Sequence, residues 1–186
     1  MGRLVYSSIA SLDGYVADEA GDFSWAVPDD EVHAFVNDAM RPFGTHLYGR
    51  RTYAMMTAWE TEPPGPEQPA VARDFAEIWR AADKVVYSTT LERAVTARTR
   101  VERTFDPEAV ARLKADLDHD LIIGGPTLAA HALAAGLVDE CRLYLAPAVV
   151  GGGNPVFPAG VRLALDLLDE RRFGNGTAYL RYGVRA

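Results

Sequence analysis

The 186-residue sequence contains one cysteine, Cys141, so no disulfide can form within the chain and no cysteine-based zinc site is expected. No apolar run approaches the ~20 residues that a membrane span requires. Basic residues number 19 against 26 acidic ones, and the formal charge of −7 argues against a nucleic-acid-binding surface. The expectation is a cytoplasmic protein in a reducing compartment, with neither nucleic acid nor membrane as partner.

Two functional signatures are also missing. The first strand is not followed by the Gly-x-Gly-x-x-Gly fingerprint of simple doubly wound dinucleotide folds. The histidine-glutamate pair followed by Pro-Cys-x-x-Cys, typical of zinc deaminases, is absent, and the 4 histidines are scattered without metal-ligand spacing. The sequence therefore predicts no metal site and no deaminase activity.

What is present is a regular alternation of apolar strand patterns and helical patterns, in a chain that is 48% hydrophobic. This favours a single domain spanning 1–186, of the α/β class, with a largely parallel sheet covered by helices on both faces. Strands are predicted at 3–10, 45–48, 84–87, 120–123 and 140–147, with a further one near Val101, and helices at 29–40, 51–58, 70–81, 107–117 and 127–135.

The C-terminal part departs from this alternation. Segments 163–173 and 177–184 read as two strands around Gly174-Asn175-Gly176, which is a strong hairpin signal. A mixed sheet with antiparallel strands at one edge follows. Segment 61–69, with four prolines and a glycine, is predicted to be a stiff surface loop.

A glycine-rich turn follows the strand predicted at 120–123. Glycines let the backbone approach an anion closely, a proline suits the first position of a helix, and the free N–H groups of a helix start favour negative charge. The alternative is a tight strand-to-helix turn that binds no ligand. The residues concerned are Gly124, Gly125, Pro126, Thr127 and Leu128.

Two more strands end in polar residues. Gly49 is followed by Arg50, Arg51 and Thr52, and a guanidinium can hold a phosphate with two parallel hydrogen bonds. The third strand end carries the hydroxyls of Ser88, Thr89 and Thr90. Three such ends in one small protein suit a dinucleotide, although the arginines could be solvated and the hydroxyls could cap a helix.

The order of these motifs resembles the dihydrofolate reductase superfamily. Within it, the chain is most similar to the reductase (C-terminal) domain of the bifunctional deaminase-reductase of riboflavin biosynthesis and to its stand-alone relatives. The resemblance implies a three-layer α/β/α fold, an NADPH-dependent reductase and a homodimer, here through the hairpin region 161–184. It rests on residues 11–17 (SLDGYVA), 48–53 (YGRRTY), Ser88, 123–128 (IGGPTL), 143–147 (LYLAP) and 150–157 (VGGGNPVF).

The resemblance also implies how the cofactor is held. Gly49, Arg50, Arg51 and Thr52 would meet the adenosine-side phosphates, and Arg50 with Ser88 and Thr89 would hold the 2′-phosphate. Residues 124–128 would line the pyrophosphate. The nicotinamide amide would lie against backbone groups near Ile9, Val16 and Ala17. No acidic residue is evident to bind a free ribose 2′-hydroxyl, which favours NADPH over NADH.

The reaction implied is hydride transfer to a C=N or C=O carbon of a pyrimidine- or pterin-like small molecule, as in 5-amino-6-(5-phosphoribosylamino)uracil reductase. Asp13 or Asp30, or water held by them, would supply the proton. Each has a simpler reading, because Asp13-Gly14 could be only a turn, and Asp29 and Asp30 could be a helix cap and a first-turn acid.

The acceptor pocket is predicted from fewer signals. Trp25 could stack on a flat ring or merely anchor the core. Ala146, Pro147 and Gly152 belong to a strand end and a glycine-rich loop that help to form the substrate pocket in riboflavin-type reductases, and that loop could instead be a flexible connection.

Two alternative functions stay open. Dihydrofolate reductases keep a carboxylate on the first helix, and Asp30 occupies that place. Ala146 replaces the threonine that usually supports this carboxylate, which weakens that alternative. A non-catalytic NADPH-binding regulator is the other, since a fold does not determine a function.

Overall fold

The computed structural model describes residues 1–185, and its centre is an eight-stranded sheet in the order β5-β4-β3-β6-β1-β7-β10-β9. The six strands from β5 to β7 run parallel, whereas β10 is antiparallel to both β7 and β9. The mixed, mostly parallel α/β sheet with a C-terminal antiparallel hairpin is thereby confirmed. The strands are β1 (Leu4–Ser11), β3 (Phe43–Gly49), β4 (Asp83–Tyr87), β5 (Thr99–Glu102), β6 (Asp120–Gly124), β7 (Glu140–Ala146), β9 (Leu165–Arg172) and β10 (Ala178–Val184).

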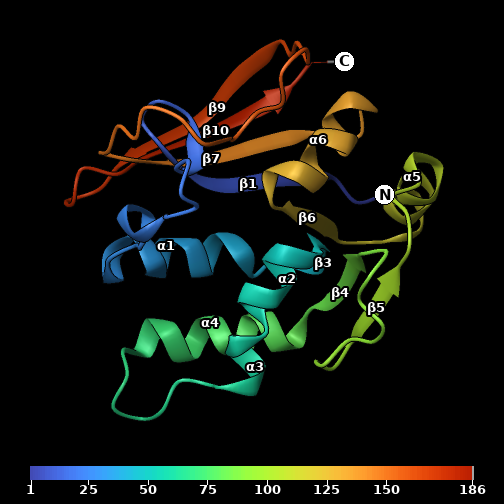
Figure 1. Cartoon of the computed structure of the whole chain (residues 1–186), viewed down its shortest axis with the longest axis horizontal. Helices are drawn as coiled ribbons and strands as arrows, with labels where there is room; N and C mark the ends of the chain where they lie inside the picture. The colour runs from blue at the N-terminus through green and yellow to red at the C-terminus, as the bar shows by residue number, and fades with distance from the viewer. Residues whose placement is uncertain (186) are drawn as a thin grey trace.

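Helices cover both faces of the sheet, which gives three layers (Figure 1). On one face α1 and α4 lie side by side, and α2 packs against β3. On the other face lie α5 and α6. The helices are α1 (Asp30–Met40), α2 (Arg50–Met56), α3 (Ala58–Thr61), α4 (Ala70–Ala81), α5 (Pro107–Asp116) and α6 (Pro126–Ala134), with a short 3-10 helix η1 (Ser24–Ala26). None of the helices in residues 1–185 is long and apolar enough to cross a membrane.

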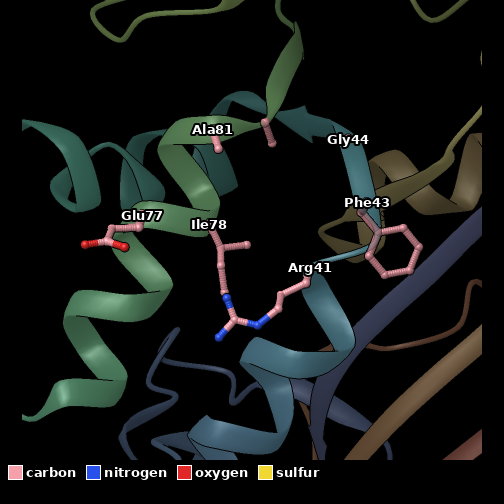
Figure 2. Close-up of a pocket in the computed structure, with 7 residues that line it drawn as sticks. Arg41, Phe43, Gly44, Glu77, Ile78 and Ala81 are labelled. Atoms are coloured by element: carbon pink, nitrogen blue, oxygen red, sulfur yellow. The ribbon is translucent and has the colours of Figure 1, made fainter.

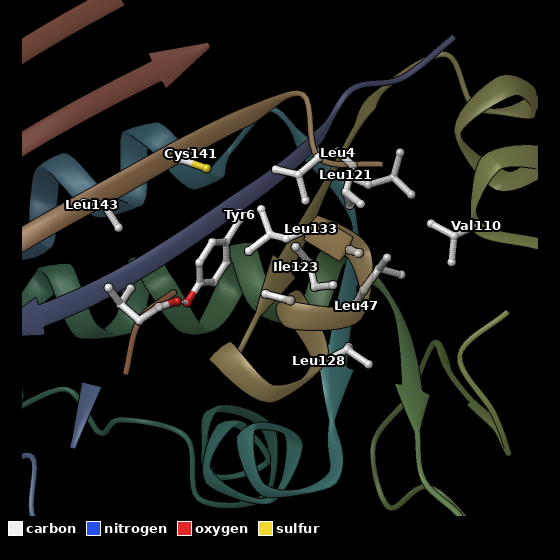
Figure 3. Packing of buried hydrophobic residues seen from close by; sticks show 14 of the residues in the cluster. Leu4, Tyr6, Leu47, Val110, Leu121, Ile123, Leu128, Leu133, Cys141 and Leu143 are labelled. Carbon is white, nitrogen blue, oxygen red and sulfur yellow. Dashed lines mark hydrogen bonds between the residues drawn. The ribbon is translucent and has the colours of Figure 1, made fainter. Parts of the chain in front are cut away.

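The strands bury side chains on both sides, because consecutive residues of a strand point to opposite faces. The face toward α5 and α6 is filled by a cluster that Figure 3 shows, and there the Tyr6 hydroxyl donates to the Val156 carbonyl over 2.8 Å. The face toward α2 and α4 holds Tyr48, Tyr53, Phe75, Trp79 and Val86. The first cluster includes Leu4, Tyr6, Leu47, Leu121, Ile123, Leu128, Leu133 and Cys141.

One predicted helix is divided in the structure. The expected helix at 51–58 begins at Arg50, breaks at Thr57 and continues as α3 to Thr61. The Thr57 hydroxyl donates to the Ala54 carbonyl over 2.8 Å, and such local bonds compete with the regular helical ladder. The other predicted helices and strands differ from the structure by one or two residues at their ends, and the strand near Val101 is β5.

Two pieces of structure were not predicted from the sequence. A two-stranded sheet joins β2 (Tyr15–Ala17) to β8 (Asn154–Pro155), and η1 follows β2. Strands of three and two residues carry too little periodicity to be recognised in isolation. The hairpin turn at 174–176 is confirmed, with Gly176 in the left-handed region at φ 88° and the Phe173 N–H donating to the Thr177 carbonyl over 3.0 Å.

Candidate functional site

The parallel part of the sheet brings the predicted site segments to one edge. β1, β3, β4, β6 and β7 run in the same direction, so the loops that follow them all leave from their carboxyl ends. The chain leaves β3 toward α2 on one face and leaves β6 toward α6 on the opposite face. Neighbouring strands whose connections diverge in this way open the crevice where open α/β sheets bind ligands.

The two glycine turns lie against each other at this crevice. A Cβ added to Gly125 would collide with the hydroxyl oxygen of Thr52, and one added to Gly49 would lie 3.8 Å from the Cβ of Leu128. The structure therefore joins segments 49–52 and 124–128, which are 72 residues or more apart in the sequence. Packing also favours glycine at position 124, since a Cβ added there would be 3.0 Å from the Tyr48 ring.

The start of α6 has the properties of an anion site. Gly125 is the N-cap residue with φ 88°, a conformation that L side chains rarely adopt, and Pro126 occupies the first turn. No side chain caps this helix start. The first-turn N–H groups and the positive end of the helix dipole are therefore available to a negatively charged group.

Arginines and hydroxyls gather at the end of β4. Arg50 Nη1 donates to Thr90 Oγ1 over 2.7 Å, so the hydroxyl that contacts Arg50 belongs to Thr90 and not to Ser88 or Thr89. Ser88 is buried, and its Oγ accepts from the N–H groups of Thr90 and Leu91. Ser88 thus shapes the start of the loop after β4, where no helix begins within residues 88–98, while its own hydroxyl hydrogen stays available to a ligand. Thr89 and Arg51 are exposed.

The structure adds Arg103 to this group. Arg103 follows β5 and donates through Nη1 to the carbonyls of Ser88 and Leu91, over 3.2 and 2.7 Å. No local pattern distinguishes Arg103 among the 19 basic residues, because its position depends on β5 pairing with β4. A parallel strand placed at the sheet edge is a tertiary feature that local patterns do not specify.

The other side of the site is formed by the loops that follow β1 and β7. Asp13 is exposed, and its carboxylate accepts hydrogen bonds from the N–H groups of Val150 and Gly151. Ile9 packs with the aromatic cluster under α1, and Val16 packs against the large cluster on the opposite face. The Ala17 carbonyl lies against Gly153 of the glycine-rich loop.

The two acidic residues at the start of α1, Asp29 and Asp30, have different positions and roles. Asp29 is the N-cap, with its Oδ1 accepting from the Val32 N–H over 3.0 Å, and Asp30 is an exposed first-turn residue. The simpler reading of this pair is therefore confirmed, and it leaves the Asp30 carboxylate at the helix start. α1 follows β1 in the chain, so this helix start belongs to the same edge of the sheet.

Trp25 and Pro147 complete the predicted acceptor side. Trp25 is half-buried in η1, which packs against β1, and its indole Nε1 is shielded from solvent and has no acceptor among residues 1–185. Ala146 is the buried last residue of β7, and Pro147 contacts the hairpin turn, 3.3 Å from where a Cβ of Gly176 would lie. Gly152 faces the Glu19 carboxylate across the glycine-rich loop.

A cavity of about 420 Å³ lies elsewhere, at the opposite edge of the sheet. It is lined by the end of α1, the start of β3 and the end of α4, and Arg41 extends toward Ile78 across it (Figure 2). A second hollow, of about 730 Å³, lies between the end of α6 and the end of β10. Neither contains a residue predicted for the site, and we place the site by the converging loops.

The sheet order, the helices on both faces and the C-terminal antiparallel hairpin define a three-layer α/β protein with a mixed, mostly parallel sheet. The chain belongs to the RibD C-terminal domain family, whose model matches residues 3–179. This is the family of the reductase domain of RibD, an oxidoreductase of riboflavin biosynthesis.

One curated relative and several solved structures are similar to nearly the whole chain. The uncharacterised protein YyaP of Bacillus subtilis is 26% identical over 182 residues, covering 97% of this chain and 94% of that protein. A protein assigned to riboflavin biosynthesis in Shewanella sp. PV-4 has a similar structure, with a TM-score of 0.76 at 21% identity over 99% of both chains. The deaminase/5-amino-6-(5-phosphoribosylamino)uracil reductase of Thermotoga maritima matches with a TM-score of 0.65 at 18% identity, over 99% of this chain but 57% of the larger protein.

Proposed function

We propose that this chain is an NADPH-dependent reductase of the riboflavin-biosynthesis type, acting on a pyrimidine- or pterin-like small molecule. The observation that carries the proposal is the contact between the two glycine turns, at residues 49–52 and 124–128, where the connections after the paired strands β3 and β6 leave toward opposite faces of the sheet. A dinucleotide has a pyrophosphate that suits such a helix start. The family is the reductase domain of RibD, which supports this reading.

The residues present fit the phosphate groups of NADPH. Within residues 1–185 the start of α6 has no side-chain cap, and the absence of a side chain at Gly125 lets the Thr52 hydroxyl lie close to its backbone at this helix start. Arg50 and Arg103 lie on either side of the Ser88–Thr90 turn, so two guanidinium groups are available to a 2′-phosphate. Arginine binds such a dianion through charge-assisted hydrogen bonds.

When bound, NADPH supplies the hydride for the reduction. The acceptor carbon gains the hydride, and the adjoining nitrogen or oxygen gains one proton. Among this chain's residues, Asp30 lies at the start of α1 with an exposed carboxylate, and we propose that it holds or relays that proton. We propose that the ring of the half-buried Trp25 stacks on the flat ring of the molecule that is reduced.

The test begins with binding. Fluorescence quenching of the 3 tryptophans would be followed during titration with NADPH and with NADH, in the wild type and in Arg50→Ala. Preference for NADPH that collapses in the variant supports the cofactor site. Failure of both dinucleotides to bind contradicts the reductase assignment.

Acceptors would then be screened by NADPH oxidation, with pyrimidine, pterin and carbonyl compounds. Reduction of a ribosylaminopyrimidine supports the riboflavin-type activity. Reduction of dihydrofolate that disappears in Asp30→Asn would instead indicate a dihydrofolate reductase. Binding of NADPH without oxidation by any of these acceptors would indicate a nucleotide-binding regulator.

We further propose that two copies of the chain associate through the hairpin of β9 and β10. β9 is the last strand of the sheet and is exposed along most of its length, with Leu167 and Leu168 exposed by 52% and 53%. An unpaired edge strand that presents large apolar side chains is a template for association.

A further inference from the structure

Asp13 makes contacts that suit holding a loop better than donating a proton. Its Oδ2 accepts from the Gly151 N–H over 2.8 Å, and both carboxylate oxygens lie 3.2 Å from the Val150 nitrogen. These two N–H groups belong to the glycine-rich loop, residues 147–155, which follows β7. Asp13 itself belongs to the first loop, residues 12–17, which follows β1. A single carboxylate thus connects two loops that are more than 130 residues apart in sequence.

Backbone bonds on either side of Asp13 continue this connection. The Leu12 N–H donates to the Ala148 carbonyl over 2.8 Å, and the Val156 N–H donates to the Gly14 carbonyl over 2.9 Å. Directly after Gly14, β2 pairs with β8. The two loops therefore form one continuous wall beside the carboxyl ends of β1 and β7.

The contact is too close for a side chain at one position. Gly153 has φ 129°, and a Cβ added there would collide with the Ala17 carbonyl oxygen and lie 2.6 Å from the carbonyl carbon of Asp18. The glycine-rich loop thus meets the first loop backbone to backbone. Its conformation depends on both this close approach and the carboxylate of Asp13.

We propose that Asp13 is a positioning residue, whose carboxylate holds the glycine-rich loop closed against β2 and thereby sets the affinity for the acceptor molecule. This rests on the proposed function, and on the expectation from the sequence that the glycine-rich loop helps to form the acceptor pocket. It assigns Asp13 a role other than proton donor and leaves the proton to a different group.

The electrostatics agree with this assignment. Interaction with the Ser11 hydroxyl, together with the N–H groups of Gly151 and Val150, lowers the pKa of Asp13 below its ordinary value. A carboxyl group with a lowered pKa is charged near neutral pH, where it accepts hydrogen bonds well and donates a proton poorly.

The first experiment measures the loop and needs no activity. Amide hydrogen exchange of Val150 and Gly151 would be followed by NMR in the wild type, Asp13→Ala and Asp13→Asn. Exchange should accelerate by about tenfold or more in Asp13→Ala, as local opening becomes easier, and by less in Asp13→Asn, which keeps one acceptor oxygen. Unchanged exchange in Asp13→Ala would overturn the proposal, whether or not the protein reduces any acceptor.

Asp22→Ala is the matched control. Asp22 lies in the same β1–α1 connection, is exposed, and also has a lowered pKa, but its carboxylate bonds to Ser24 within its own turn. The Asp22→Ala substitution removes one negative charge, as Asp13→Ala does, but it removes no contact with the glycine-rich loop. Exchange at Val150 and Gly151 should match the wild type, and equal acceleration in Asp22→Ala would show a general charge effect and contradict the proposal.

Kinetics then separate positioning from proton donation. In Asp13→Ala, KM for the acceptor should rise by about tenfold with kcat and the pH–rate profile nearly unchanged, because uniform binding is lost. A collapse of kcat in Asp13→Asn, with loss of the limb of the pH profile that reports an acid, would show Asp13 to be the donor and overturn the proposal. If the wild type oxidises no NADPH with any acceptor, the proposed function fails, while amide exchange still decides the role of Asp13 in the loop.

A second variant, Gly153→Ala, tests the contact between the two loops from the side of the glycine-rich loop. Gly153→Ala should accelerate exchange at Val150 and Gly151 as Asp13→Ala does, because its Cβ cannot fit against the backbone of Ala17. Gly160→Ala is its control, since Gly160 also has a positive φ, of 81°, but has nothing within 4 Å of an added Cβ. Equal behaviour of the two glycine variants would contradict the close-approach argument.

Discussion

Single residues decide the cofactor preference that we propose. Arg103 reaches the Ser88–Thr90 turn from β5 and Arg50 reaches it from α2, so both can contribute a charge-assisted hydrogen bond to a 2′-phosphate. Arg103→Ala should weaken NADPH binding by about 10- to 100-fold, since bonds to charged groups contribute ~1.5–3 kcal/mol, and should leave NADH binding nearly unchanged. Isothermal titration with both cofactors measures this.

The control for this prediction is Arg185→Ala. Arg185 is exposed and paired with Asp166 at the other edge of the sheet, so its removal changes the net charge equally without touching the site. Equal losses of NADPH and NADH affinity in Arg103→Ala would contradict a 2′-phosphate contact.

Another residue-level prediction concerns pH. Glu140 is 2% exposed and bonded to Arg3, Arg142 and Arg181. Burial alone would raise its pKa, but hydrogen bonds from Arg181 and Arg142 outweigh it and lower the pKa below the ordinary 4.5. The charged form therefore stabilises the fold fully above pH 4.5, and this contribution is lost as the pH falls through the lower folded pKa.

Glu140→Gln should cost about 3–5 kcal/mol at neutral pH, because it leaves the buried Arg142, together with the more exposed Arg3 and Arg181, without this charge partner. Urea unfolding measured from neutral pH down to below 4 should show the gap to the wild type narrowing in acid, since protonated glutamate resembles glutamine. Glu102→Gln, which removes an exposed carboxylate paired with Arg100, should change stability by less than ~1 kcal/mol. A gap that does not depend on pH would contradict the pKa argument.

At the scale of an element, α6 is flanked by two glycines whose substitution should affect NADPH binding differently. Gly125 precedes the helix and Gly136 follows it, with φ 88° and 64°. Alanine at either position should cost about 1–2 kcal/mol of backbone strain. Only Gly125→Ala should also weaken NADPH binding, by about tenfold or more, because its Cβ would displace Thr52 and occupy the approach to the helix start.

Gly136→Ala is thus the built-in control, as nothing lies within 4 Å of an added Cβ there. Thermal unfolding and NADPH titration on both variants separate strain from site damage. Equal NADPH affinity in the two variants would remove the start of α6 from the proposed cofactor site.

Some helix ends could be predicted from local sequence patterns and others could not. The N-terminal end of α1 and the glycine after α6 were predictable, because caps and left-handed glycines are local chemistry. The break at Thr57 and the continuation of the helical segment to Thr61 were not, since the bond from the Thr57 hydroxyl to the Ala54 carbonyl is seen only in the structure.

For the whole molecule, the proposed dimer is the main prediction. Leu167→Lys would place a charge in the middle of the exposed edge strand, and charged residues on edge strands oppose pairing. Light scattering coupled to size exclusion should give a dimer for the wild type and a monomer for Leu167→Lys. Val95→Lys, which changes another exposed apolar residue in the β4–β5 connection, should remain dimeric. A monomeric wild type would contradict the proposal.

The sequence by itself determined the α/β class, nearly every strand and helix, the hairpin and the glycine turns, because periodicity, caps and turn residues act over a few neighbouring positions. Tertiary structure alone decided which of these segments meet. It placed Thr52 against Gly125, brought Arg103 to Ser88 through a strand at the sheet edge, and tied Asp13 to Gly151. Such contacts depend on strand order and on the packing of distant segments, which no local pattern encodes.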